Sequence, residues 1–158
     1  MKHLKLFPSA LLFTITPAKA MDEIAAMGYH RDEIRCLARV IFHESRGEPP
    51  KGKLGVAKVT FNRTNHSEFP STICRVIAVK NAYPWYHKLR TPYRSTEYAK
   101  AERLAVEVFV KEKAGVKWAP KSVEKALFFN GVPFKLPRLT YATRIGGHHF
   151  YNMKERRR

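Results

Sequence analysis

Residues 34–49 carry an amphipathic helical pattern that ends on a carboxylate, and this pattern restricts the folds open to the chain. Ile34, Leu37 and Ile41 recur at helical spacing and therefore share one face. Glu44 follows three residues after Ile41, so its side chain projects from nearly the same face. The sequence therefore predicts a helix that buries its apolar face and brings an acid to the edge of the core.

Glu44 has the setting expected of a general acid. An ionised carboxylate is costly to bury, so a carboxyl group on an apolar face has a raised pKa and keeps its proton nearer neutrality. Gly47 and Pro49 predict that the helix ends just beyond Glu44, where the negative end of the helix dipole also disfavours ionisation. A protonated carboxyl group there can donate to a glycosidic oxygen. The alternative is an ordinary helix-end glutamate that is solvated or paired with Arg46.

Glu48 is the nearest second carboxylate, about one helical turn beyond Glu44. Some glycosidases use two carboxylates, although the second is dispensable if groups of the substrate take over its role. We favour a salt bridge with Arg46 or Arg63 as the interpretation of Glu48.

The chain is strongly basic. Its 158 residues include 30 Lys and Arg and 13 Asp and Glu, a formal net charge of +17. Such a charge suits a polyanionic partner, such as nucleic acid, an anionic cell wall or an outer membrane surface. The length favours one domain with a real core, and we expect a monomer. No apolar run approaches the roughly 18 residues of a membrane span, so we predict no transmembrane span.

The first 20 residues differ from the rest. Two lysines precede an apolar run over residues 6–16, and Ala18 and Ala20 form the small-x-small pattern of a signal-peptidase site. We interpret residues 1–20 as a signal peptide or N-terminal leader. The alternative is a segment that packs on the domain or stays flexible.

The two cysteines, Cys36 and Cys74, both lie in apolar helical patterns. We interpret them as buried thiols, with a disulfide as the alternative in an exported chain. A disulfide between them would close a loop of about 40 residues and contribute ~3–4 kcal/mol. CxxC spacing is absent, so the sequence predicts no Cys-rich zinc site.

Three further helices are predicted from their apolar stripes and caps. The first runs over about residues 51–63, and Ser71 is the expected N-cap of a short helix that follows. The longest stripe covers about residues 96–113, with Ser95 as its N-cap.

Strand signals gather near the C-terminus. An apolar run at residues 126–129 is followed by Asn130 and Gly131, a pair typical of a tight β-hairpin turn. Residues 146–151 predict a strand with alternate side chains on opposite faces.

The seven histidines raise the alternative of a zinc site. A catalytic zinc ion needs three protein ligands and an open position for water. The pair His43-Glu44 begins an HExxH motif, but position 47 is Gly. His148 and His149 are adjacent, so on a strand they would point to opposite faces. We therefore predict no metal site and interpret the histidines as surface or cleft-lining side chains.

Basic side chains are interspersed among aromatic ones in residues 83–94, a pattern that suits the stacking of nucleic-acid bases. No zinc finger, RRM or KH signature accompanies it, and no GxSxG motif predicts a nucleophilic serine. Tyr83 and Trp85 also suit stacking against sugar rings. Packing in the core is an equally weighted alternative for both.

Several blocks of residues occur in a characteristic order and spacing. They comprise His43-Glu44-Ser45-Arg46-Gly47-Glu48-Pro49, Gly52, Val56-Ala57, Val59, Asn62-Arg63, Phe69-Pro70-Ser71-Thr72, Cys74, Val76-Ile77 and, near the end, Gly147-His148-His149-Phe150-Tyr151. Together they resemble the SleB-like cell wall hydrolase family, which includes the spore-cortex-lytic transglycosylases. The resemblance covers about residues 32–151.

The resemblance implies a lysozyme-like single domain, mainly α with a small β element (α+β). It also implies a lytic transglycosylase that cleaves the MurNAc–GlcNAc β-1,4 bond of peptidoglycan without a cofactor. Glu44 matches the family's catalytic glutamate, which first protonates the glycosidic oxygen and then, as a base, helps the muramoyl 6-hydroxyl to close a 1,6-anhydro ring. The residues expected to bind substrate or support the acid are Ser45, Glu48, Tyr83, Trp85, His149 and Tyr151.

The expected organisation follows from these parts. Residues 21–31 would be a linker or short helix, residues 32–153 the catalytic domain and residues 154–158 a basic tail. The expected partners are peptidoglycan glycan strands and the anionic cell envelope surface, with no nucleic acid. The protein would be exported to the periplasm or cell wall, or be a phage endolysin acting on the host wall. The alternatives are a zinc-dependent N-acetylmuramoyl-L-alanine amidase and a basic nucleic-acid-binding module.

Overall fold

The computed structural model describes residue 22 and residues 31–154. The leader predicted at residues 1–20, nearly all of the segment 21–31 and the end of the basic tail lie outside the described residues. The elements in chain order are α2 (Arg31–Glu44), α3 (Pro50–Thr64), α4 (Ile73–Ala78), α5 (Thr96–Lys113), the short 3-10 helix η1 (Lys121–Val123), β1 (Ala126–Asn130), β2 (Leu139–Ile145) and β3 (His148–Met153).

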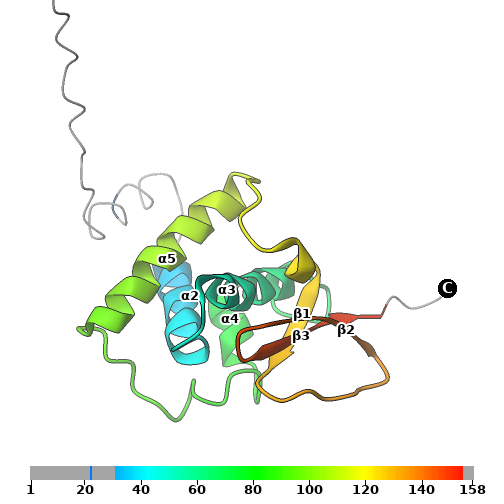
Figure 1. Ribbon diagram of the computed structural model, residues 1–158. Helices are drawn as coiled ribbons and strands as arrows, with labels where there is room; N and C mark the ends of the chain where they lie inside the picture. Colours follow the sequence, from blue (N-terminus) through cyan, green and yellow to red (C-terminus); the bar gives the residue numbers. More distant parts are fainter. Residues whose placement is uncertain (1–21, 23–30, 155–158) are drawn as a thin grey trace, which may run out of the picture.

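The helices pack around the apolar face of α2. Ile34, Leu37 and Val40 are fully buried there, and Ile41 is 3% exposed. Figure 1 shows α5 along one side of the molecule and the small sheet on the other, with α2 and α3 between them. Helix α2 is thus enclosed by the other helices, and its last residue, Glu44, lies at the edge of this helical core. No helix among the described residues meets the length and apolarity that a membrane span requires.

The long helix and its cap agree with the prediction. Helix α5 spans Thr96–Lys113, and the Ser95 side chain accepts a hydrogen bond from the Tyr98 N–H at 3.1 Å. The predicted cap of α4 was wrong by one residue. Thr72, not Ser71, has the extended backbone of an N-cap and accepts from the Arg75 N–H.

The predicted hairpin at Asn130 and Gly131 is wrong. The sheet is antiparallel with the order β1-β3-β2, so β1 pairs with β3 and not with the strand that follows it. Strand β3 takes the centre because Phe150 and Tyr151 are buried, at 0% and 3% exposure, whereas most of β2 is half-buried or exposed. The tight turn joins β2 to β3 instead, with Gly146 at a φ of 58° that glycine adopts readily.

A disulfide joins Cys36 of α2 to Cys74 of α4, across a sequence separation of 38. The interpretation of the two cysteines as buried thiols is therefore wrong. Both residues are half-buried at the α2–α4 contact rather than inside the core. The Glu33 carboxylate strengthens the same contact by accepting from the Ile73 N–H at the start of α4.

The sheet packs on α3 through a small residue. The ring of Phe150 occupies the space next to Gly55, where an added Cβ would lie 2.7 Å from its Cζ. A second apolar cluster, consisting of Val59, Val123, Ala126 and Phe150, continues this contact. The helix and the sheet therefore approach closely, and this approach sets the position of the sheet relative to the end of α2.

Candidate active site

Glu44 is half-buried, and among the residues that the structure describes its carboxylate has one direct hydrogen-bond partner, the indole of Trp85. The Trp85 Nε1–H donates to Oε1 at 2.5 Å, from a residue 41 positions further along the chain. No ion pair joins Arg46 to Glu44 within 4.0 Å, and the exposed Arg46 instead has its guanidinium 5.4 Å from the centre of the Phe42 ring. The acid is therefore held by the core and not by a surface ion pair.

Burial raises the pKa of Glu44 above its ordinary value. The hydrogen bond from Trp85 and the positive charge of Arg63 act in the opposite direction, because both stabilise the carboxylate, but burial has the larger effect. The protonated form of Glu44 therefore persists to a higher pH than for a solvated glutamate, as a general acid requires.

Trp85 is held in place by a stack of polar and cationic side chains. Its ring lies parallel to His43, with centroids 4.4 Å apart and an interplanar angle of 17°. The Arg39 guanidinium lies 5.3 Å from the ring centre, and His43 Nε2 forms a 2.9 Å hydrogen bond with Thr91 Oγ1. Burial, followed by the charges of Arg39 and Arg46, lowers the pKa of His43, which favours the neutral ring in this stack.

The core-packing alternative holds for both aromatic candidates. Trp85 is 6% exposed and Tyr83 is 2% exposed, so neither ring offers a broad face to a sugar. The Tyr83 hydroxyl shares a 3.0 Å hydrogen bond with Thr60 Oγ1, and burial raises the pKa of Tyr83. The loop that carries both residues folds inward onto α2 and α3, where Trp85 bonds Glu44 and Tyr83 bonds Thr60.

Arg63 is a buried cation behind this site, and its sequence pattern predicts no catalytic or substrate-binding role for it. It is 6% exposed, its Nε donates to the Leu127 carbonyl at 2.8 Å, and its guanidinium lies 5.2 Å from the Tyr83 ring centre. Its Nη1 is buried without a hydrogen-bond partner among the described residues. The only sequence signal was its place in the family-like block with Asn62, since helical periodicity does not distinguish a buried arginine from a solvated one.

Ser45 and Glu48 organise the turn after Glu44. The Ser45 hydroxyl, 1% exposed, donates to the Ile41 carbonyl at 2.5 Å and closes the end of α2. Both oxygens of Glu48 accept from the Gly147 N–H, at 3.2 and 3.1 Å. The expected salt bridge of Glu48 with Arg46 or Arg63 is therefore wrong: this carboxylate instead ties the α2–α3 turn to the β2–β3 turn.

The histidines of β3 lie on opposite faces, as the alternation predicts. The Nδ1 of His148 is 3.7 Å from a Glu48 oxygen, and burial lowers the pKa of His148 despite that neighbour. His149 and Tyr151 lie on the face that carries Tyr141, and the Tyr151 hydroxyl accepts from the Phe134 N–H at 3.0 Å.

The structure therefore places Glu44, Trp85 and Tyr83 in one cluster. It puts Ser45 and Glu48 at the adjoining turn, and His149 and Tyr151 on the sheet, on the face opposite Phe150. Among residues 31–154, no group of three or more His, Cys, Asp or Glu side chains has the proximity to hold a metal ion.

Comparisons with known proteins agree with this architecture. Residues 47–151 match the family described as Cell Wall Hydrolase. A spore cortex-lytic enzyme of Bacillus subtilis is 42% identical over 67 residues, which cover 39% of this chain and 22% of that protein. One from Oceanobacillus iheyensis is 39% identical over 56 residues, covering 35% of this chain and 20% of its own length. Each match thus covers only a small part of the curated relative.

Two solved structures have the same fold. The crystal structure of the catalytic domain of the Bacillus cereus SleB protein matches with a TM-score of 0.56 and 26% identity, over 78% of this chain and 91% of that chain. The catalytic domain of the germination-specific lytic transglycosylase SleB from Bacillus anthracis has the same score and identity, over 96% of its chain. The predicted α+β fold, mainly helical with a small sheet, is confirmed. The family match covers more than half of this chain, and the chain therefore belongs to the cell wall hydrolase family.

Proposed function

We propose that this protein is a lytic transglycosylase that cleaves the β-1,4 bond between N-acetylmuramic acid and N-acetylglucosamine in peptidoglycan. The observation that carries the proposal is Glu44, a half-buried acid with a raised pKa that is held by the Trp85 indole. Family membership and the name of the Bacillus anthracis relative support the reaction type. The matched family segment begins at residue 47, so the role of Glu44 is argued from its geometry and from the resemblance of its sequence block.

The proposed reaction uses one carboxyl group twice. Trp85 occupies Oε1 of Glu44, which leaves Oε2 to carry the proton. That proton passes to the glycosidic oxygen as the bond to the muramoyl C1 breaks, and the positive charge develops on the sugar ring. The Glu44 carboxylate then takes the proton of the muramoyl 6-hydroxyl while the oxygen of that hydroxyl bonds to the muramoyl C1. The ring closes as a 1,6-anhydro sugar, no water is consumed, and Glu44 is again protonated.

Trp85 and Arg63 have defined roles in this cycle. Between the two proton transfers Glu44 is a carboxylate, and a charge-assisted hydrogen bond from the indole stabilises it. The positive charge of Arg63 acts in the same direction. These groups keep the raised pKa of Glu44 within a range where the carboxyl group can both donate and accept a proton.

The remaining expectations belong to the same proposal. The catalytic domain spans residues 32–153, after a leader at residues 1–20 and a short segment at residues 21–31, and the basic tail covers residues 154–158. The partners are peptidoglycan strands and the anionic cell envelope surface, which the protein reaches by export or as a phage endolysin. It acts as a monomer and needs no cofactor.

Mass spectrometry of the soluble products from purified peptidoglycan tests the reaction. We expect fragments that end in 1,6-anhydromuramic acid from the wild type, none from Glu44→Gln, and no loss of activity with a metal chelator. Reducing-end muramic acid would overturn ring closure and require a base that activates water. Free stem peptides on intact glycan strands, together with loss of activity in chelator, would mean a zinc amidase instead.

A further inference from the structure

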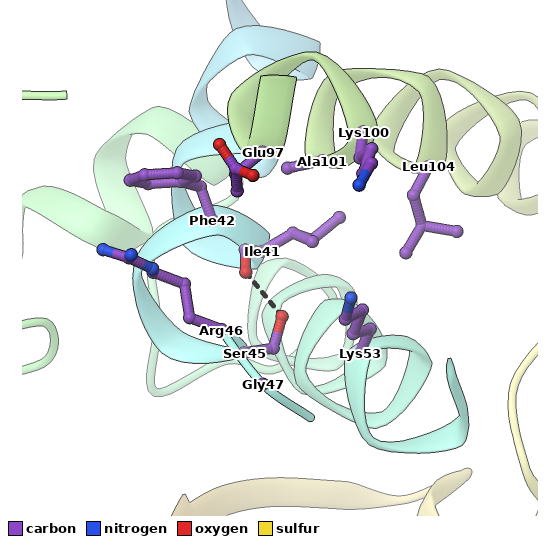
Figure 2. Close-up of a pocket in the computed structure, with 10 residues that line it drawn as sticks. All are labelled: Ile41, Phe42, Ser45, Arg46, Gly47, Lys53, Glu97, Lys100, Ala101 and Leu104. Atoms are coloured by element: carbon purple, nitrogen blue, oxygen red, sulfur yellow. Dashed lines mark hydrogen bonds between the residues drawn. The ribbon is translucent and has the colours of Figure 1, made fainter. Parts of the chain in front are cut away.

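A concave site lies where the C-terminal end of α2 meets the N-terminal parts of α3 and α5. It is a cavity of about 320 Å³, and neither Glu44 nor Trp85 lines it. Figure 2 shows its walls: Ile41, Phe42 and the turn from Ser45 to Gly47 on one side, and residues of α3 and α5 on the other. The mechanism proposed above makes no use of this cavity.

The cavity combines an apolar floor with a cationic rim. Ile41 and Ala101 are 3% and 5% exposed, and they supply the floor together with Phe42 and Leu104. Three cations line the rim, Arg46, Lys53 and Lys100, against one acid, Glu97. In Figure 2 the ammonium groups of Lys53 and Lys100 extend from α3 and α5 toward the same space.

The rim cations have no acidic partner within residues 31–154. Among the described residues, none of the three lies within 4.0 Å of a carboxylate. Lys58, five residues further along α3 than Lys53, shows the contrast, because it pairs with Glu112 at 3.1 Å and Glu124 at 3.7 Å. Two like charges that face one cavity repel each other, and an anion placed between them would remove that repulsion.

Lys53 lies in the first turn of α3. That turn contains no acidic residue of its own, and the carboxylate of Glu48, which precedes the helix, already lies against Gly52 at the helix end. A negatively charged ligand in the cavity would therefore interact favourably with the two lysines rather than with the helix end. The apolar floor requires that the ligand also carries small apolar groups beside its charge.

We propose that this cavity binds a carboxylate of the stem peptide attached to muramic acid, in addition to the glycan bound near Glu44. The proposal rests on the proposed function, because that function defines the substrate. The stem peptide hangs from the same muramic acid whose C1 bond is cleaved, and it combines free carboxylates with the methyl groups of alanine. Its carboxylate would lie between Lys53 and Lys100, and its methyl groups on Ile41 and Ala101.

One substrate can reach both places by crossing the end of α2. Ser45 and Arg46, which line the cavity, directly follow Glu44 in the chain. A helix with its side chains is about 10–12 Å across. An extended peptide of about four residues spans roughly 13–14 Å, so a stem peptide is longer than the width of the helix whose end separates the acid from the cavity.

Titration calorimetry of the full chain with an N-acetylated stem tetrapeptide tests the binding directly, without any cleavage. The double variant Lys53→Gln/Lys100→Gln should lose at least about tenfold in affinity, the effect of removing charge-assisted hydrogen bonds. The matched control Lys51→Gln/Arg103→Gln removes two exposed charges from the same two helices outside the cavity and should bind as the wild type does. Circular dichroism melts of both doubles establish that they fold.

Two further binding measurements test whether the cavity recognises the carboxylate of the peptide. The same peptide with all its carboxylates converted to amides should not bind, and Glu97→Gln should bind the acidic peptide more tightly because it removes the one acid of the rim. On peptide-bearing glycan the Lys53→Gln/Lys100→Gln double should raise KM and leave kcat unchanged. On glycan stripped of its peptides it should match the wild type.

Three results would overturn the proposal. The first is equal affinity of the Lys53→Gln/Lys100→Gln and Lys51→Gln/Arg103→Gln variants for the peptide. The second is binding of the peptide after its carboxylates have been converted to amides. The third is binding of polyglycerol phosphate but not of the peptide. The last would make the cavity a site for phosphate-bearing wall polymers. Peptide binding alongside products without anhydro ends would leave the cavity assignment standing and contradict the proposed reaction instead.

Discussion

Two opposing influences act on the single carboxyl group of Glu44. Burial removes water that would stabilise the charged form, whereas the Trp85 N–H and the Arg63 charge stabilise it directly. The balance leaves the pKa raised. A group that donates one proton and then accepts another, as proposed for Glu44, benefits from this balance, because a pKa far from the working pH in either direction would impede one of the two steps.

Replacement of Trp85 tests this balance. Trp85→Phe removes the indole donor but keeps a ring, so the pKa of Glu44 should rise further and the alkaline limb of the pH–rate profile should move to higher pH. The rate should also fall by about tenfold or more, because the carboxylate loses its fixed partner. Lysis of purified walls across a pH series measures both effects.

Trp118→Phe is the matched control, because the Trp118 Nε1–H donates to Glu112 at 2.7 Å and contacts neither Glu44 nor Trp85. Its profile should keep the wild-type limbs. A Trp85→Phe profile that moved toward lower pH would contradict the role given to the indole.

The raised pKa of Glu44 also predicts how stability depends on pH. The folded protein holds this proton more tightly than the unfolded chain, so the stabilisation is complete below the unfolded pKa and is lost as the pH rises through the folded pKa. Glu44→Gln cannot ionise. It should therefore melt at a higher temperature than the wild type at alkaline pH, and the difference should shrink as the pH falls. Melting curves across the pH range test this, and a variant less stable than the wild type at high pH would disprove it.

At the scale of elements, the contact between α3 and β3 depends on Gly55. An added methyl group would lie 2.7 Å from Phe150 Cζ. Gly55→Ala should therefore destabilise the protein, because overpacking costs about 1–3 kcal/mol and the gain in helix propensity returns only about 1 kcal/mol. Chemical denaturation measures the change in the free energy of unfolding.

Gly131→Ala is the control for that experiment, because nothing lies within 4 Å of the added methyl group and its backbone does not require glycine. Its stability should stay near that of the wild type. If Gly55→Ala were equally stable, the close approach of α3 to the sheet would not be needed for the fold.

Local sequence signals predicted individual helices and strands well, but they predicted poorly which strands pair with one another. Ser95 caps α5 through a hydrogen bond three residues away, so the sequence contained the whole interaction. Asn130 and Gly131 have equally strong local turn chemistry, but the hairpin they predict did not form. Instead β3, which carries the buried Phe150 and Tyr151, takes the central position and pairs with both other strands.

For the whole molecule, the net charge of +17 predicts that electrostatic attraction contributes to binding of an anionic cell envelope. Attraction of an exposed basic surface to an anionic envelope is screened by salt, with a Debye length of about 10 Å at 0.1 M and about 3 Å at 1 M. Co-sedimentation with purified walls should therefore decline steeply as salt rises. Cleavage of short soluble glycan fragments should decline much less, because the half-buried Glu44 acts at close range.

Glu44→Gln serves as the control in the co-sedimentation experiment, because it should bind walls with the same salt dependence while cleaving nothing. Wall binding that did not respond to salt would contradict the electrostatic attachment. Tight, salt-dependent binding of DNA without wall cleavage would support the nucleic-acid alternative.

The sequence by itself determined the features that depend on near neighbours: the amphipathic α2 with Glu44 at its end, the caps and extent of α5, and the blocks of residues that indicated the family. Each arises from interactions within a few residues, which periodicity and turn chemistry report directly. Tertiary structure alone decided that Trp85 bonds Glu44 across 41 residues, that Glu48 bonds Gly147 across 99, and that Cys36 joins Cys74. Such partners are selected by the packing of the whole core, because burial leaves each polar group with only the partners that the fold brings within hydrogen-bonding distance.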